Sequence, residues 1–267
     1  MFCNRMSAAL SMAVVLGFSG GPAAADSWFS GDWYLQVGAA GFSAPKFEGA
    51  KGRIFSASPL ISLGRAGSQV RFTSRNDNMS FSMLDVGSLR AGPVGKIVWG
   101  RSSGDADETK GLDSVKWGLE AGGFAEVYPT DWLRVRGEVR RGFRSHSGVV
   151  TDVFVDAFQD VTSTVRISGG PRLQIGSAKY LDAYYGVTPA ESVRSGLRPY
   201  KADTGLSAVG VGGEIKWRTT DAITTSAFGE YRRLMGSAKD SSLVRQRGSA
   251  NQLMLGVSAT YRFDFTM

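Results

Sequence analysis

Cysteine and histidine are almost missing from this 267-residue chain, which contains one of each, Cys3 and His146. Zinc sites are built from clusters of these two residue types, so the sequence gives no reason to expect a metal. It suggests no other cofactor either. Because Cys3 lies near the start, the rest of the chain has no disulfide, and its stability must come from burial or from closure of a sheet.

Long apolar runs are also scarce. The one marked run, from Met6 to Phe18, follows Arg5 and precedes three alanines that end at Ala25. It is shorter than the roughly 20 residues that a membrane-spanning helix needs. The pattern predicts a secretory signal peptide over 1–25, cleaved between Ala25 and Asp26, and a single domain over 26–267. No later run is long enough for a transmembrane helix.

The C-terminal segment 251–265 alternates strictly in character. Every second residue from Leu253 is apolar, and the residues between them are polar or glycine except for Met254. Such alternation gives a strand one apolar face and one polar face. The segment exceeds the roughly 9–11 residues of a membrane-crossing strand, and its aromatic end suits an interfacial girdle. We therefore predict a lipid-facing side made of Leu253, Leu255, Val257, Tyr261, Phe263 and Phe265.

The same alternation recurs along the chain and predicts an antiparallel, transmembrane β-barrel of about twelve strands. Short links alternate with long ones, as periplasmic turns alternate with extracellular loops in outer-membrane barrels. A soluble all-β sandwich is the alternative, but it needs neither this alternation of links nor such long strands. In 79–87 the apolar positions change parity after Met83, which predicts a bulge. The predicted strands are 33–42, 54–63, 69–75, 79–87, 89–99, 115–128, 132–143, 149–158, 161–177, 204–217, 222–234 and 251–265.

Two local features can be predicted more closely. In the longest loop, Thr188 can cap a short helix that has Pro189 at its first position, Glu191 in a capping box and Gly196 after its end. A three-residue turn at 129–131 would place Glu126 opposite Arg134, and Glu120 opposite Arg140, with all four side chains inward.

The polar faces of the predicted strands carry many charges that would point into the lumen. They fit either a lumen plugged by ion pairs or a polar channel, because twelve strands is intermediate between filled barrels and aqueous porins. The candidate lumen charges are Lys116, Glu120, Glu126, Arg134, Arg136, Glu138, Arg140, Arg166, Glu214, Lys216, Glu230 and Arg232.

Features of an enzyme are sparse. His146 lies between two serines, but adjacency in sequence does not make a catalytic triad. The segment 100–104 matches Gly-x-Ser-x-Gly without the strand and helix which that motif needs. The acidic loop 103–113 resembles a calcium loop only loosely and is better read as a solvated loop. We therefore expect no enzyme activity.

The formal net charge of the chain is +7. This excess would suit anionic lipopolysaccharide or peptidoglycan, or simple solvation. The arginines alternate along strands instead of clustering on a helix, so we expect no nucleic acid partner.

Several segments resemble the MipA/OmpV family of outer-membrane proteins (MltA-interacting protein and OmpV). The resemblance is carried by 47–52 (FEGAKG), 89–128, 233–263 and above all 179–206 (KYLDAYYGVTPAESVRSGLRPYKADTGL). Ser237 stands where the family usually has aspartate, and Ser242 where it usually has proline.

This resemblance implies a barrel in the cell outer membrane with lipid and lipopolysaccharide around it. It also implies a scaffold that brings a lytic transglycosylase together with a peptidoglycan synthase. A small-solute channel or a surface adhesin is the alternative. The family supplies no catalytic residues, so none are assigned.

Overall fold

The computed structural model describes residues 15–16, 31–65 and 72–266. The predicted signal cleavage between Ala25 and Asp26 lies outside these residues.

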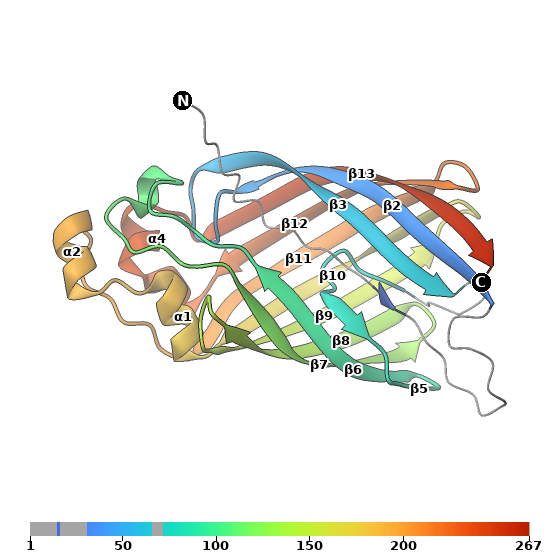
Figure 1. Cartoon of the computed structure of the whole chain (residues 1–267), viewed down its shortest axis with the longest axis horizontal. Helices are drawn as coiled ribbons and strands as arrows, with labels where there is room; N and C mark the ends of the chain where they lie inside the picture. The colour runs from blue at the N-terminus through green and yellow to red at the C-terminus, as the bar shows by residue number, and fades with distance from the viewer. Residues whose placement is uncertain (1–14, 17–30, 66–71, 267) are drawn as a thin grey trace.

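The described residues form one curled sheet dominated by ten long antiparallel strands (Figure 1). Neighbours in the sheet follow the chain from β6 to β13, and β13 then pairs with β2 and β2 with β3. The long strands are β2 (Asp32–Pro45), β3 (Arg53–Arg65), β6 (Leu89–Val98), β7 (Gly118–Thr130), β8 (Leu133–Phe143), β9 (Val149–Asp160), β10 (Val165–Gly176), β11 (Gly205–Arg218), β12 (Ile223–Leu234) and β13 (Asn251–Thr266). The prediction of an antiparallel β-barrel is confirmed.

The sheet is irregular between β3 and β6. Two short strands, β4 (Met79–Phe81) and β5 (Leu84–Val86), both pair with β6, in place of the one strand predicted over 79–87. Between Ser80↔Val94 and Leu84↔Ala91 this side has one residue more than β6, so the predicted bulge is present. Pro93, which lacks an N–H to donate, lies on β6 between the stretches that pair with β4 and β5. A two-residue strand, β1 (Val15–Leu16), pairs in parallel with β4 and lies beside β3.

The predicted strand at 69–75 is wrong where it can be tested. Residues 69–71 lie outside the described part of the chain, and residues 72–75 are not in a strand. The segment 72–78, called the crossing segment below, instead runs through the interior of the barrel. Its polar side chains Asn76, Asp77 and Asn78 contact side chains of the inner walls.

The predicted register between β7 and β8 is also wrong. Thr130 pairs with Leu133 across a two-residue turn, and a bulge at 128–129 then shifts the register, so Glu126 lies opposite Arg136. Pro129 explains the bulge because it cannot donate a ladder hydrogen bond. The error amounts to two residues, so each side chain keeps the predicted face.

The outer face of the sheet is apolar, with aromatic rings near both ends of the strands. Trp99 and Trp117 are exposed near the end with the long loops, and Trp217 and Tyr261 near the end with the short turns. Between these rings, the outward side chains are mostly Leu, Val, Ile and small residues. This arrangement is that of a transmembrane barrel with two aromatic girdles.

Helices gather at the long-loop end (Figure 1). The predicted helix is confirmed as α2 (Pro189–Ser195), with a complete capping box between Thr188 and Glu191 and a left-handed Gly196. Three α-helices that the sequence analysis missed accompany it: α1 (Ala178–Tyr185), α3 (Gly236–Asp240) and α4 (Ser242–Gln246). A 3-10 turn, η1 (Asp107–Thr109), lies in another loop. Within the described residues, every helix is too short or too polar to cross a membrane.

Candidate functional site: the lumen and its cap

The centre of the lumen is occupied by the crossing segment, which contacts opposite walls of the barrel. On one wall, Asp77 receives two hydrogen bonds from Arg134 of β8. On the other wall, Lys216 of β11 donates from Nζ to the Thr73 carbonyl over 3.1 Å, and Asn76 donates to Glu230 of β12. The segment is thus fixed across the lumen instead of lining it.

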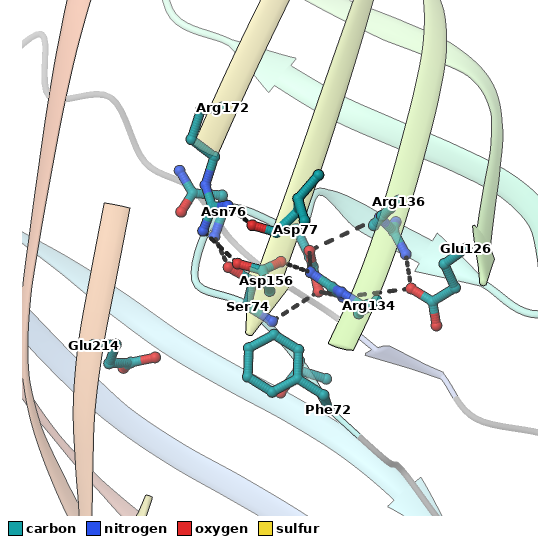
Figure 2. Close-up of polar contacts among 12 residues, drawn as sticks. Phe72, Ser74, Asn76, Asp77, Glu126, Arg134, Arg136, Asp156, Arg172 and Glu214 are labelled. Atoms are coloured by element: carbon teal, nitrogen blue, oxygen red, sulfur yellow. Dashed lines mark hydrogen bonds and ion pairs between the residues drawn. The ribbon is translucent and has the colours of Figure 1, made fainter. Parts of the chain in front are cut away.

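Arg134 is the centre of the ion-pair network on the first wall. Its two terminal nitrogens each lie 2.7 Å from one carboxylate oxygen of Asp77, a bidentate pair. The nitrogen Nη2 also lies 2.7 Å from Asp156 of β9, and Nη1 lies 3.4 Å from Glu126 of β7 (Figure 2). The Arg134 side chain is fully buried. Burying a guanidinium is costly unless carboxylates surround it, and here three do.

The network extends along β8 toward the long-loop end. Arg136 donates to Glu126 over 2.9 Å and to Glu138 over 2.8 Å. Arg140 contacts Glu138, and it donates to Glu120 over 2.9 Å. The crossing segment joins here too, because Asn78 donates to Glu138 over 2.6 Å. The ion pairs Arg134–Glu126 and Arg140–Glu120 expected from the sequence are therefore present, although the backbone register differs.

His146 closes this network near the long-loop end. The backbone N–H of Gly148 donates to Nδ1 over 3.2 Å, which leaves the proton on Nε2. Nε2 lies 3.0 Å from Glu120, and the ring packs edge-on against Tyr180. Both ring nitrogens are therefore engaged in structural contacts, and neither is directed at a serine. This geometry is unlike the base of a catalytic triad.

Aromatic rings fill the lumen toward the short-turn end. Phe72 of the crossing segment stacks on Phe158 of β9 with ring centres 4.5 Å apart, and Tyr128 of β7 meets Phe158 edge-on. The Tyr128 hydroxyl donates to the Phe72 carbonyl over 3.4 Å. These inward rings add an apolar layer below the ionic network.

The second wall carries a cation–π contact and a small cavity. Arg75 lies over the ring of Phe228, with its guanidinium carbon 3.6 Å from the ring centre. Beside it remains a polar cavity of about 20 Å³, lined in part by Asn76, Gly213 and Glu230. Glu214 lies away from the Arg134 network on this side (Figure 2). A second cavity, of about 10 Å³, lies on the first wall between Asp77, Glu126 and Arg136. The lumen therefore keeps only small polar cavities on both sides of the crossing segment.

The long-loop end of the lumen is covered by a folded cap made of α1 to α4 and the loops around them. Leu181 and Tyr185 of α1 pack with Leu234 of β12 and Val244 of α4 in one buried cluster. Ser241 beside α4 donates to the Tyr185 carbonyl over 2.6 Å. A second cluster joins Leu112 of the loop before β7 to Val187, Leu197 and Leu243. The cap is therefore one packed unit, not a set of separate loops.

The structure distributes the twelve candidate lumen charges unevenly. Six of them, on β7 and β8, are buried in the network: Glu120, Glu126, Arg134, Arg136, Glu138 and Arg140. Glu214, Lys216, Glu230 and Arg232 lie on the opposite wall and are partly exposed. Arg166 pairs with Asp160 at the rim of the short-turn end. Lys116 precedes β7 and is exposed, so it lies outside the network.

Sequence reasoning missed several network members. Asp152 and Asp156 on β9 bind Arg140 and Arg134, and Arg172 on β10 binds Asp156. The two aspartates gave only a weak signal, because Phe154 and Phe158 share their inward face and β9 therefore has apolar residues on both faces. Asp77 gave no signal, since residues 76–78 were expected to form a short link between two strands of the wall.

The other motifs noted in the sequence do not assemble into a site. Ser102 of the Gly-x-Ser-x-Gly match lies in a loop where its N–H donates to Asp105. The acidic residues of this loop are engaged separately, Glu108 with Gly52 N–H and Asp113 with Arg194. Among the described residues, no group of three or more His, Cys, Asp or Glu side chains is arranged to hold a metal.

The chain matches one protein-family model and is similar to several solved outer-membrane protein structures. The family model described as "MltA-interacting protein MipA" matches residues 37–263. One similar solved structure is Neisserial surface protein A, with 12% sequence identity over 87% of this chain and 99% of that chain and a TM-score of 0.27. A second is OprG from Pseudomonas aeruginosa, with 9% identity over 88% of this chain and 97% of that chain and a TM-score of 0.27. A third is a bacterial polysaccharide outer membrane secretin, with 9% identity over 86% of this chain and 98% of that chain and a TM-score of 0.45. Curated proteins gave no match.

The apolar outer face, the girdles, the filled lumen and the capped end define an outer-membrane β-barrel protein. The family match extends from β2 to β13 and therefore includes every long strand of the sheet. The chain belongs to the MipA family.

Proposed function

We propose that this protein is a non-enzymatic scaffold that brings a lytic transglycosylase together with a peptidoglycan synthase at the inner face of the outer membrane. The observation that carries the proposal is the lumen itself. A crossing segment and a buried ionic network fill its centre, and a packed cap covers one end. A barrel filled in this way can bind partner proteins with its outer surfaces, whereas its interior has little room for the passage of a solute.

The family description points to the first partner, since the matching family is described as MltA-interacting. The surface that such a partner can reach is the short-turn end, which faces the periplasm in barrels of this kind. Ser163 and Thr220 are exposed there, in the turns after β9 and β11. These turns are short, so they present rigid attachment points close to the membrane.

Site-specific photo-crosslinking in cells tests the scaffold. A photoreactive amino acid would replace Ser163 or Thr220 in the turns, and Val193 on the exposed face of α2 would serve as the matched control at the other end. Crosslinked products would be purified through a tag and identified by mass spectrometry. We expect a lytic transglycosylase or peptidoglycan synthase at the turn positions and neither at Val193.

Two controls make the result decisive. Heat-modifiable migration on gels checks that each variant is folded in the outer membrane. An abundant unrelated barrel carrying the same photoreactive residue in a periplasmic turn measures background capture. Equal capture by that barrel, or no murein enzyme at any turn position, would reject the scaffold for this protein.

A further inference from the structure

The outward face of the barrel carries charge of one sign. In the described strands β2 to β13, no aspartate, glutamate or lysine occupies an outward position, as judged by alternation along each strand. Arginine does occupy such positions near the long-loop end: Arg53 on β3, Arg141 on β8 and Arg233 on β12. Charge on a lipid-facing strand is costly in the middle of the bilayer but tolerated near the interface. All three lie within a few residues of the strand ends, so they sit at the interface.

Arg53 and Arg233 flank the start of β13 on one side of the barrel. Arg233 pairs with Asn251 in the ladder. Arg53 reaches across β2, so that its Nη1 donates to the Leu253 carbonyl over 2.9 Å and its Nη2 to Ser43 Oγ over 3.0 Å. These bonds fix the guanidinium against the wall and leave some of its five donors free.

Arg141 and Arg144 form a second group on the far side of β9, β10 and β11. Arg144 has a left-handed backbone with φ of 74°, the one such non-glycine residue in the described chain. Its guanidinium carbon lies 4.1 Å from the centre of the exposed Trp117 ring. A strained backbone that sets an arginine on an interfacial tryptophan often marks a binding role. Arg141 lies three residues earlier, near the end of β8, with its side chain exposed.

We propose that Arg53, Arg141, Arg144 and Arg233, called the rim arginines, bind the phosphate groups of lipopolysaccharide in the outer leaflet. Arginine matches phosphate because its planar donors can form two parallel hydrogen bonds, and it stays charged near apolar surface. Because no Asp or Glu side chain points outward from the described strands β2 to β13, no outward carboxylate on these strands competes with phosphate for the rim arginines. The outer leaflet presents phosphate at the level of the long-loop girdle, where Trp117 lies.

Native mass spectrometry of the purified full-length barrel tests this site, with bisphosphorylated lipid A as the probe. The variants are Arg141→Gln with Arg144→Gln, Arg53→Gln with Arg233→Gln, and all four together. The matched control is Arg218→Gln with Arg262→Gln, which removes the same charge from exposed arginines at the short-turn end. We expect each rim pair to weaken binding of lipid A about tenfold, the size expected for loss of a charge-assisted bond.

The control pair should bind lipid A as the unmodified protein does. Lipid A without phosphate should bind the unmodified protein and the rim variants equally. Equal weakening by the control pair would show a general effect of net charge and overturn the proposal. So would undiminished binding by the fourfold variant, once heat-modifiable migration shows that it is folded. Neither result depends on a murein enzyme, so the scaffold is tested separately.

Discussion

At the residue scale, the main feature is how completely the buried charges are paired. Arg134 and Arg140 are fully buried, and each is held by three carboxylates. A buried ion pair contributes little net stability over an apolar core, but removing one member leaves an uncompensated charge and is strongly destabilising. The network therefore fixes one arrangement of the interior. It does so through Asp77, which belongs to the crossing segment and not to the wall.

A single glycine tests the packing of the cap. Gly111 has φ of +83°, and a Cβ built on it would lie 2.7 Å from the Ser195 backbone, next to the end of α2. We expect Gly111→Ala to destabilise the cap by about 1–3 kcal/mol, because it combines backbone strain with a clash against main chain. Limited proteolysis of the folded barrel measures this as faster cleavage between α1 and α2.

The matched control is Gly104→Ala in the same loop. Gly104 has no atom within 4 Å of a built Cβ and no positive φ, so its substitution should leave the cleavage rate unchanged. Equal protection of both variants would show that the contact between Gly111 and Ser195 does not hold the cap together.

At the element scale, the sequence predicted those strands whose two faces differ in polarity. It located β13, β7 and β8 closely, because outward apolar residues alternate there with inward charges. It was least certain where rings point inward, as Phe154 and Phe158 do on β9. Residues 69–75, which include the first part of the crossing segment, were assigned to the wall because Val70 and Phe72 alternate with polar residues. Local alternation cannot distinguish a wall strand from a segment inside the lumen.

Side-chain contacts proved more predictable than strand register. The β7–β8 ion pairs form despite the shift at Pro129, since a shift of two residues keeps every side chain on its face and long side chains reach diagonal neighbours. The cap helices α3 and α4 could not be anticipated, because each has five residues and depends on packing rather than on its own propensity.

The capping box of α2 should make this helix sensitive to acid. Burial raises the pKa of Glu191, but hydrogen bonds from the Asp113 and Thr188 backbone N–H groups and from the Thr188 hydroxyl outweigh burial, so the net pKa is lowered. A carboxylate with a lowered folded-state pKa stabilises the fold above its unfolded pKa, about 4.3, and loses that contribution as the pH falls through the folded value. We expect hydrogen exchange in α2, corrected for intrinsic rates, to accelerate below about pH 4.3.

Two substitutions separate the charge from the cap geometry. Glu191→Gln keeps one acceptor oxygen, enough for the Thr188 bonds or the Asp113 bond but not for both, and it cannot titrate. Its exchange in α2 should therefore be faster than in the unmodified protein at neutral pH but should not change with pH in this range. Thr188→Ala should raise exchange at every pH, by an amount equal to about 1 kcal/mol of helix stability. An unchanged pH dependence in Glu191→Gln would assign the acid sensitivity to another group.

At the scale of the whole molecule, the barrel is closed twice in series. The crossing segment and its ionic network close the middle, and the packed cap closes the long-loop end. Both closures depend on contacts between residues distant in the sequence, such as Asp77 and Arg134. The sequence therefore left a plugged lumen and a polar channel equally open, and only the placement of 72–78 favours the plug.

Two closures in series predict a specific pattern of ionic conductance. Asp77→Ala removes the carboxylate that holds the crossing segment to Arg134, and we expect it to destabilise the barrel interior by about 3–5 kcal/mol, as for a broken buried pair. Asp107→Ala is the control, because Asp107 pairs with Lys110 on the surface of a loop. Current through serial barriers is limited by the tighter one, so Asp77→Ala or Gly111→Ala alone should raise conductance only slightly.

In planar bilayers, the gain in conductance of the double variant Asp77→Ala with Gly111→Ala should exceed the sum of the gains of the two single variants. Such non-additivity is expected when either barrier alone limits the current. Full conductance from Asp77→Ala alone would mean that the cap is no barrier. Conductance of the unmodified protein equal to that of the double variant would mean that the crossing segment does not block the lumen. That result would move a solute channel ahead of the scaffold, since the filled lumen is the observation on which the scaffold depends.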